Sequence, residues 1–191
     1  MATSNSQRIG IWVIAAVLLV GTLGSFVAMM LAPANQQIDA AEQEKQLAAY
    51  QEQQKLAAED RAKSAEPLSG HAASSFDAAA VTDLQKEVLV AGTGEEVKAT
   101  DTIKVSYFGW LPDGRIFDSS KVKGVDTPIE LPLTGVIAGW TEGLQGEKVG
   151  STVKLTIPAD KAYGSQSSGI IPANSPLTFI VIINSITKAQ G

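Results

Sequence analysis

The sequence predicts an α+β domain in which an antiparallel β-sheet is wrapped on one short helix, preceded by a transmembrane helix and a helical stalk. Three observations lead to this prediction. An uncharged apolar run lies near the N-terminus, a polar segment without glycine follows it, and short apolar alternations fill the C-terminal half. These patterns are typical of a membrane span, a solvated helix and β-strands, in that order. The 191 residues leave room for one ordinary domain plus these appendages.

Residues 9–32 carry no charge and exceed the roughly 20 apolar residues that a membrane-spanning helix needs. A cleaved signal peptide is the alternative, because Ala32-Pro33-Ala34 fits a small-x-small cleavage site. However, the apolar core of a signal peptide is usually about 7–15 residues long, so this run favours an uncleaved anchor. Arg8 precedes the run and the first charges after it are acidic. The positive-inside rule then predicts that residues 1–8 are cytoplasmic, that residues 9–32 span the cell membrane and that everything after Pro33 lies outside it.

Residues 33–66 are predicted to form a helical stalk, since Asn35 to Glu66 is rich in Ala, Gln, Glu and Lys and contains neither Gly nor Pro. Its few apolar residues do not keep a heptad register, which favours a solvated spacer over a coiled coil. Pro67 ends the stalk, and the small residues of 67–80 predict a flexible linker. The folded domain is then expected at residues 81–191.

Three segments of this domain predict strands. Thr102 to Tyr107 and Thr152 to Ile157 alternate polar and apolar residues, which is the period of a half-buried strand. Leu177 to Ile186 is apolar on both faces, so we expect this strand in the middle of the sheet.

One short helix is expected within residues 135–144, where Trp140 and Leu144 share a face. Gly139 and Gly143 lower the helix propensity of this segment, which suggests that the helix packs closely against another element. Sheet and helix together indicate the α+β class.

The composition excludes several kinds of function. The net charge of −5 is unsuited to neutralising phosphates, so no nucleic-acid partner is expected. Without cysteine the chain cannot form disulfides, thiolate metal sites or a cysteine nucleophile. The single histidine, His71, lies in a Ser/Ala-rich stretch, which argues against a Ser-His-Asp arrangement in the domain. We therefore expect neither a metal nor a cofactor.

Several motifs follow one another in the domain: Val105-Ser106-Tyr107-Phe108-Gly109, Asp113-Gly114-Arg115-Ile116-Phe117-Asp118-Ser119-Ser120, Val136-Ile137-Ala138-Gly139-Trp140, Ala162-Tyr163-Gly164 and Ile170-Ile171-Pro172-Ala173-Asn174. In this order, and over roughly residues 83–187, they resemble the FKBP-type peptidyl-prolyl cis-trans isomerases. Each fragment alone is weak, whereas the ordered set is specific.

This resemblance implies a pocket that holds a proline side chain, with Trp140 as its floor and Asp118 close to the twisting imide. The implied catalytic residues are Tyr107, Phe117, Asp118, Trp140 and Tyr163. The implied substrate-binding residues are Val136, Ile137, Ile129, Ile170, Ile171 and Phe179. Taken singly, the aromatic residues also fit an ordinary core, and Asp118 also fits a turn cap.

The chemistry of prolyl isomerisation suits these residue types. Rotation about a peptide bond faces a resonance barrier of about 18–20 kcal/mol, and no covalent bond breaks, so neither nucleophile nor metal is required. An apolar site removes the water that stabilises the planar, charge-separated form, and thereby favours the twisted form.

The sequence also departs from the family pattern. Phe108 stands where threonine is usual, and Ile129 stands where many members have another aromatic residue. The segment from Lys121 to Thr127 looks longer than in short members, and the loop 165–169 lacks the histidine often found there. These differences bear on substrate preference and drug affinity more than on fold.

The expected function is therefore a single-pass membrane enzyme that assists the folding of extracytoplasmic proteins at their proline bonds. Its expected partners are proline-containing peptides, the membrane through the N-terminal helix, and macrolide inhibitors. The alternative is a non-catalytic, membrane-tethered adaptor or chaperone that uses the same fold, because fold alone does not guarantee activity.

Overall fold

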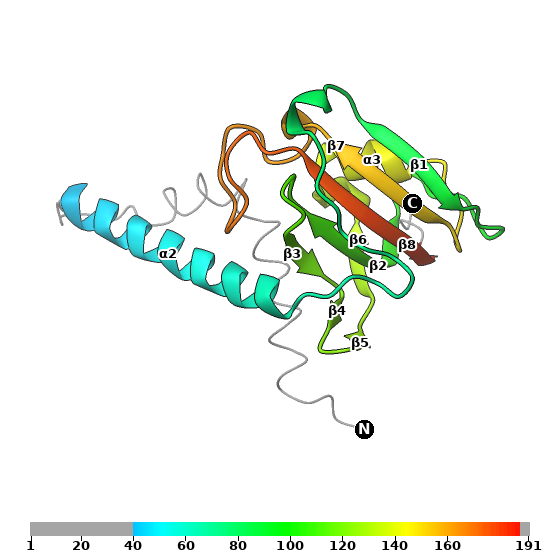
Figure 1. Ribbon diagram of the computed structural model, residues 1–191, viewed down its shortest axis with the longest axis horizontal. Coiled ribbons are helices and arrows are strands. Elements are labelled where there is room, and N and C mark those ends of the chain that lie inside the picture. The colour runs from blue at the N-terminus through cyan, green and yellow to red at the C-terminus, as the bar shows by residue number, and fades with distance from the viewer. Residues whose placement is uncertain (1–39, 188–191) are drawn as a thin grey trace, which may run out of the picture. The chain divides into compact units, whose positions relative to one another are not determined.

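The computed structural model describes residues 40–187, and residues 44–187 belong to one compact unit (Figure 1). The predicted cytoplasmic N-terminus at residues 1–8 and the predicted transmembrane helix at 9–32 lie outside the described residues, so both stay predictions. Within residues 40–187, no helix combines the length and the hydrophobicity that crossing a bilayer requires.

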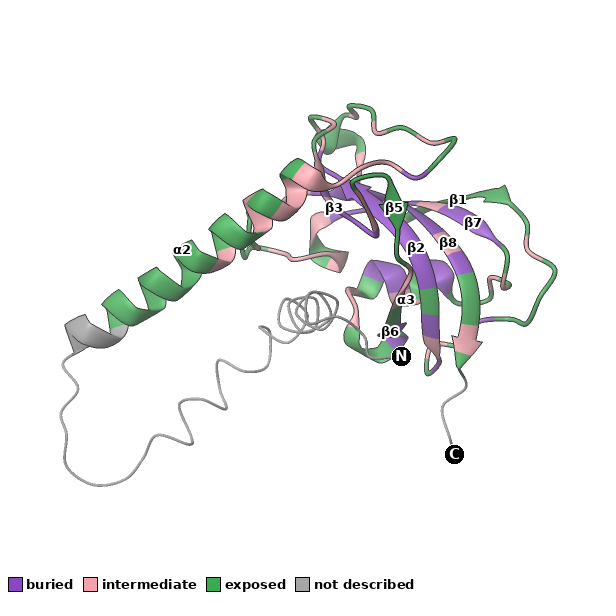
Figure 2. Ribbon diagram, turned by 90° about the horizontal axis from the view of Figure 1, so that it is seen from below, coloured by how far each residue is buried: buried purple, intermediate pink, exposed green. Residues whose placement is uncertain are grey.

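Helix α2, Ala40–Ser64, is the described part of the predicted stalk. The side chains described along its first turns are exposed, including Leu47 at 57% and Tyr50 at 48%, as a solvated helix requires. Toward its C-terminal end the exposure changes, and Ala58 and Arg61 are half-buried (Figure 2). The last turns of α2 therefore lie against the folded domain, which the prediction of a solvated spacer did not anticipate.

The main sheet is antiparallel throughout and has the strand order β1-β7-β8-β2-β3, with β6 paired to the first half of β2. A separate hairpin joins β4 and β5. The strands are β1 Gln85–Val90, β2 Thr102–Trp110, β3 Ile116–Ser119, β4 Lys121–Val122, β5 Val125–Asp126, β6 Ile129–Pro132, β7 Thr152–Ile157 and β8 Leu177–Thr187. The predicted central position of the last strand is confirmed, because β8 lies between β7 and β2 (Figure 1).

Helix α3, Ala138–Leu144, packs on one face of this sheet. A Cβ atom added to Gly139 would lie 2.3 Å from Ile157 Cγ2, and one added to Gly143 would lie 2.6 Å from Leu155 Cδ2. The expectation that these glycines permit close packing is confirmed, because any side chain here would push α3 off β7. Short 3-10 turns cover Ala78–Ala80 (η1), Leu133–Gly135 (η2) and Ala159–Lys161 (η3).

The opposite face of the sheet is covered by the segment between α2 and β1. Leu68, only 4% exposed, packs in a second cluster with Phe108, Trp110 and Ile180. The indole Nε1 of Trp110 also donates a hydrogen bond of 2.9 Å to the Ser74 carbonyl. This differs from the predicted flexible linker, because isolated apolar residues in a small-residue background give no periodic signal. Phe108, which departs from the family pattern, packs against Leu68 of this segment.

Candidate active site

Four aromatic rings meet on the face of the sheet that α3 covers, and we call them the aromatic cluster. Each comes from a different element: Tyr107 from β2, Phe117 from β3, Trp140 from α3 and Phe179 from β8. The ring centroids of Tyr107 and Trp140 are 5.4 Å apart, those of Trp140 and Phe179 are 5.4 Å apart, and those of Phe117 and Phe179 are 5.5 Å apart. All three pairs are edge-to-face, the arrangement that the quadrupoles of aromatic rings favour.

Gly109 makes room for this cluster. It lies on β2 directly opposite Phe179 of β8, two residues beyond Tyr107 and therefore on the same face. A Cβ atom at Gly109 would lie 2.6 Å from Phe117 Cζ and 2.6 Å from Phe179 Cε1. The absence of a side chain at this position thus lets the two phenylalanine rings meet over the sheet.

The indole Nε1 of Trp140 is buried and has no hydrogen-bond partner among the described residues. Leaving a buried donor unpaired costs about 1–3 kcal/mol, so such groups are uncommon in folded proteins and call for an explanation. An ordered water or a ligand carrying an acceptor would satisfy this donor.

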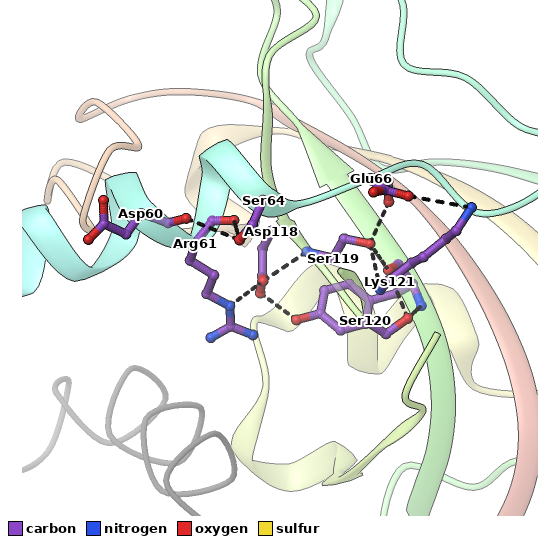
Figure 3. Close-up of polar contacts among 9 residues, drawn as sticks. Asp60, Arg61, Ser64, Glu66, Asp118, Ser119, Ser120 and Lys121 are labelled. Carbon is purple, nitrogen blue, oxygen red and sulfur yellow. Dashed lines mark hydrogen bonds and ion pairs between the residues drawn. The ribbon is translucent and has the colours of Figure 1, made fainter. Parts of the chain in front are cut away.

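Asp118 is the charged residue beside the aromatic cluster. Its Oδ2 accepts a short hydrogen bond from the Tyr107 hydroxyl, and its Oδ1 accepts one of 2.8 Å from the Ser119 backbone N–H. The guanidinium Nε of Arg61, on α2, lies 2.7 Å from the same Oδ1 (Figure 3). Both carboxylate oxygens are thus engaged, which fixes the orientation of the group.

Burial and these neighbours set the protonation state of the site. Loss of hydration raises the pKa of Asp118, while Arg61 and the donors from Tyr107 and Ser119 act in the opposite direction. Burial, with Asp118 nearby, also raises the pKa of Tyr107 well above its usual value and that of Tyr163 to about 12. Both phenols consequently stay protonated near neutral pH and serve as hydrogen-bond donors.

The aliphatic residues predicted to bind substrate come from three other segments. Ile129 of β6 lies opposite Val105, on the same face as Tyr107. Val136 and Ile137 precede α3, and the Ile137 carbonyl accepts a 2.9 Å hydrogen bond from the Trp140 N–H. The loop after η3 supplies the remaining residues of the predicted set, namely Ile170 and Ile171 alongside Tyr163. Among these five aliphatic residues, Ile171 is buried and the other four are half-buried. The role of each residue in substrate binding stays a prediction.

Sequence reasoning did not identify Arg61 as part of the site. Arg61 lies on a segment read as a solvated spacer, and its contact with Asp118 joins residues that are 57 positions apart. The pattern of a polar helix does not indicate which of its charges meets another element. No motif of the domain points to it either, so only the three-dimensional arrangement places it here.

Comparison with known proteins agrees with the fold. The sequence profile of the FKBP-type peptidyl-prolyl cis-trans isomerases matches residues 93–184. The chain is 43% identical over 134 residues to "FKBP-type peptidyl-prolyl cis-trans isomerase FkpA" of Aeromonas hydrophila, covering 70% of this chain and 49% of the relative. It is 38% identical over 136 residues to "Outer membrane protein MIP" of Legionella longbeachae, covering 71% of this chain and 58% of that protein.

A crystal structure of a peptidyl-prolyl cis-trans isomerase from Pseudomonas syringae is similar with a TM-score of 0.50 and 28% identity, over 73% of this chain and 92% of that one. The chain belongs to the FKBP-type peptidyl-prolyl cis-trans isomerase family. It spans about half the length of the curated relatives that it matches.

Proposed function

We propose that this chain is a peptidyl-prolyl cis-trans isomerase that rotates X-Pro bonds in extracytoplasmic proteins. The observation that carries the proposal is an oriented carboxylate, Asp118, joined by a hydrogen bond to a ring of the aromatic cluster. Family membership supports the same activity. In this proposal, the aromatic cluster receives the proline side chain, with Val136, Ile137, Ile129, Ile170 and Ile171 bordering the bound peptide.

Catalysis in this proposal acts on amide resonance. Resonance makes the planar imide charge-separated and places negative charge on its carbonyl oxygen, where water stabilises it. Rings that exclude water remove that stabilisation, and the fixed negative charge of Asp118 opposes the same charge on the oxygen. Both effects disfavour the planar ground state relative to the twisted state, which is differential binding of the transition state. Tyr163, which stays protonated, is available to donate to a peptide carbonyl, whereas the Tyr107 hydroxyl already donates to Asp118.

No proton transfer is needed in this scheme. From Val81 onward the sequence contains no histidine and no cysteine, the side chains that most readily titrate near neutral pH. Asp118 is paired with a guanidinium and a phenol rather than poised as a free acid or base.

The same site is expected to bind macrolides that imitate a proline peptide. Ile129 provides less flat contact area for them than an aromatic residue would.

Exchange NMR on a short Ala-Pro peptide with the purified full chain tests this function. The cis-trans exchange rate is expected to rise in proportion to protein concentration. Arg115→Gln is the control, because the Arg115 side chain is 63% exposed and its ion-pair partner among the described residues is its exposed neighbour Asp113. This variant should catalyse as the wild type does. Peptide binding, seen as shift changes without faster exchange, would instead establish the non-catalytic adaptor.

The proposed location is a single pass through the cell membrane, with residues 9–32 as the span and the domain outside. Arg8 on one side and acidic residues on the other support this orientation. One relative is named an outer membrane protein, which agrees with an extracytoplasmic domain. Protease added to intact spheroplasts is expected to remove the domain, and digestion only after lysis would contradict the orientation. A mature protein beginning at Asn35 would show that the segment is a signal peptide.

A further inference from the structure

The cation that pairs with Asp118 comes from outside the catalytic domain. Arg61 lies in the last turn of α2, and its Nε contacts Asp118 Oδ1 at 2.7 Å. The two side chains are 24% and 23% exposed, so water screens this ion pair less than it screens a pair of exposed charges. The pair Lys63–Asp60 on the same helix, for comparison, is 72% and 82% exposed.

Two sets of contacts hold the end of α2 in place. Immediately after the helix, the Glu66 N–H donates a 3.0 Å hydrogen bond to the Lys121 carbonyl, and the Glu66 carbonyl accepts one of 2.7 Å from Ser119 Oγ (Figure 3). One turn before Arg61, Ala58 lies so close to Gly169 that a Cβ atom on this glycine would be 2.6 Å from Ala58 Cβ. Arg61 therefore approaches Asp118 from a helix anchored on both sides of it.

We propose that Arg61 is a positioning residue of the site, which keeps the Asp118 carboxylate ionised and oriented, so that the last two turns of α2 complete the active site. This inference rests on the proposed isomerase function, in which the negative charge of Asp118 acts on the imide. It also means that residues 81–191, where the folded domain was expected, do not hold the complete site by themselves. A domain that began after the stalk would retain Asp118 and lose its cation.

The groups that face Asp118 from the surrounding elements explain why Arg61 matters. They are Arg61 from α2, Tyr107 from β2, Tyr163 from the loop after η3 and the backbone N–H of Ser119 from β3. Only Arg61 carries a positive charge, whereas the phenols and the amide are neutral donors. Burial favours the protonated carboxyl group, and the guanidinium is the largest influence against it. Without Arg61, the pKa of Asp118 moves upward and the negative charge is lost at a higher pH.

The test measures the titration of Asp118 and the activity of the full chain, purified in a mild detergent. Carboxyl ¹³C NMR follows Asp118, with Asp118→Asn to assign its signal. In the Arg61→Gln variant, Asp118 is expected to titrate at a higher pH than it does in the wild type. The kcat/KM of this variant is expected to fall at least about threefold between pH 8 and pH 6, while the wild type stays within about twofold. Lys63→Gln, which removes an exposed charge two residues away, should behave as the wild type.

Arg61→Lys separates charge from shape, because lysine keeps the positive charge but not the planar guanidinium. It is expected to restore the wild-type titration of Asp118 largely and the activity in part. An Arg61→Gln protein that folds and titrates as the wild type would overturn the inference. So would an Arg61→Gln protein more active than the wild type at every pH, since Arg61 would then obstruct the site. If the wild type does not catalyse, the proposed function fails, and the NMR titration alone decides whether Arg61 controls Asp118.

Discussion

Phe117→Ala is expected to lower kcat/KM by at least about tenfold, which corresponds to about 1.4 kcal/mol of transition-state stabilisation. Phe117 is 8% exposed, precedes Asp118 in the chain and packs edge-to-face on Phe179. Loss of the ring admits water to the aromatic cluster, where catalysis by desolvation requires the imide to be kept dry. Exchange NMR on the Ala-Pro peptide gives the rate constants, after circular dichroism has shown that the variant is folded.

Two further variants make this result interpretable. Truncating a buried phenylalanine costs about 3–5 kcal/mol of folding stability, so Phe117→Leu, which keeps much of the volume, is measured in parallel and should lose activity to a smaller extent. Phe76→Ala is the control of the same chemical type, because Phe76 packs in the cluster on the opposite face of the sheet. It should lose stability and keep kcat/KM within about twofold. Wild-type activity in a folded Phe117→Ala protein would mean that the aromatic cluster is only core.

Gly109→Ala is expected to destabilise the domain by about 1–3 kcal/mol, the usual cost of overpacking, and to reduce activity at the same time. The added methyl group would meet two ring carbons at 2.6 Å, one from Phe117 and one from Phe179. Both rings belong to the aromatic cluster: Phe179 packs on Trp140, and Phe117 packs on Phe179. Urea unfolding of the two proteins measures the difference in free energy.

Gly135→Ala is the matched control for this substitution. Gly135 is exposed, and the nearest atom to an added Cβ would be Pro132 Cγ at an ordinary 3.6 Å. Its free energy of unfolding should change by no more than about 0.5 kcal/mol. Equal effects at the two positions would show that the loss at Gly109 comes from the backbone rather than from the aromatic cluster.

Much of the fold was predictable because its signals are local and periodic. The alternation over Thr102 to Tyr107 and the two-sided apolar run of β8 define strands in any context, and a run buried on both faces has to lie between neighbours. Likewise, the glycines of α3 indicated close packing before their partners, Ile157 and Leu155, were known. These predictions depend on the chemistry of one segment at a time.

The aromatic cluster needed the resemblance to a family as well. Tyr107, Phe117, Trp140 and Phe179 come from four elements, and nothing in their individual surroundings shows that the rings meet. The ordered motifs supplied that long-range information. Beyond the motifs, the prediction failed to anticipate two contacts.

Both of these contacts involve the region before the domain. Leu68 lies in a segment with the composition of a linker, yet it is 4% exposed against Phe108 and Trp110. Arg61 lies in a helix with the composition of a spacer, yet it pairs with Asp118. Composition describes how a segment behaves in water, whereas docking depends on a complementary surface elsewhere in the chain, which composition does not describe.

The central claim is that the imide is twisted by loss of water and by a fixed charge, without transfer of a proton. The pH dependence of kcat/KM for the wild-type chain, from about pH 6 to pH 9, tests it most directly, with Asp118→Asn measured alongside. We predict a nearly flat profile for both proteins, with Asp118→Asn lower throughout because the negative charge is missing. A bell-shaped profile in the wild type that disappears in Asp118→Asn would contradict the account, because Asp118 would then transfer a proton in the rate-limiting step.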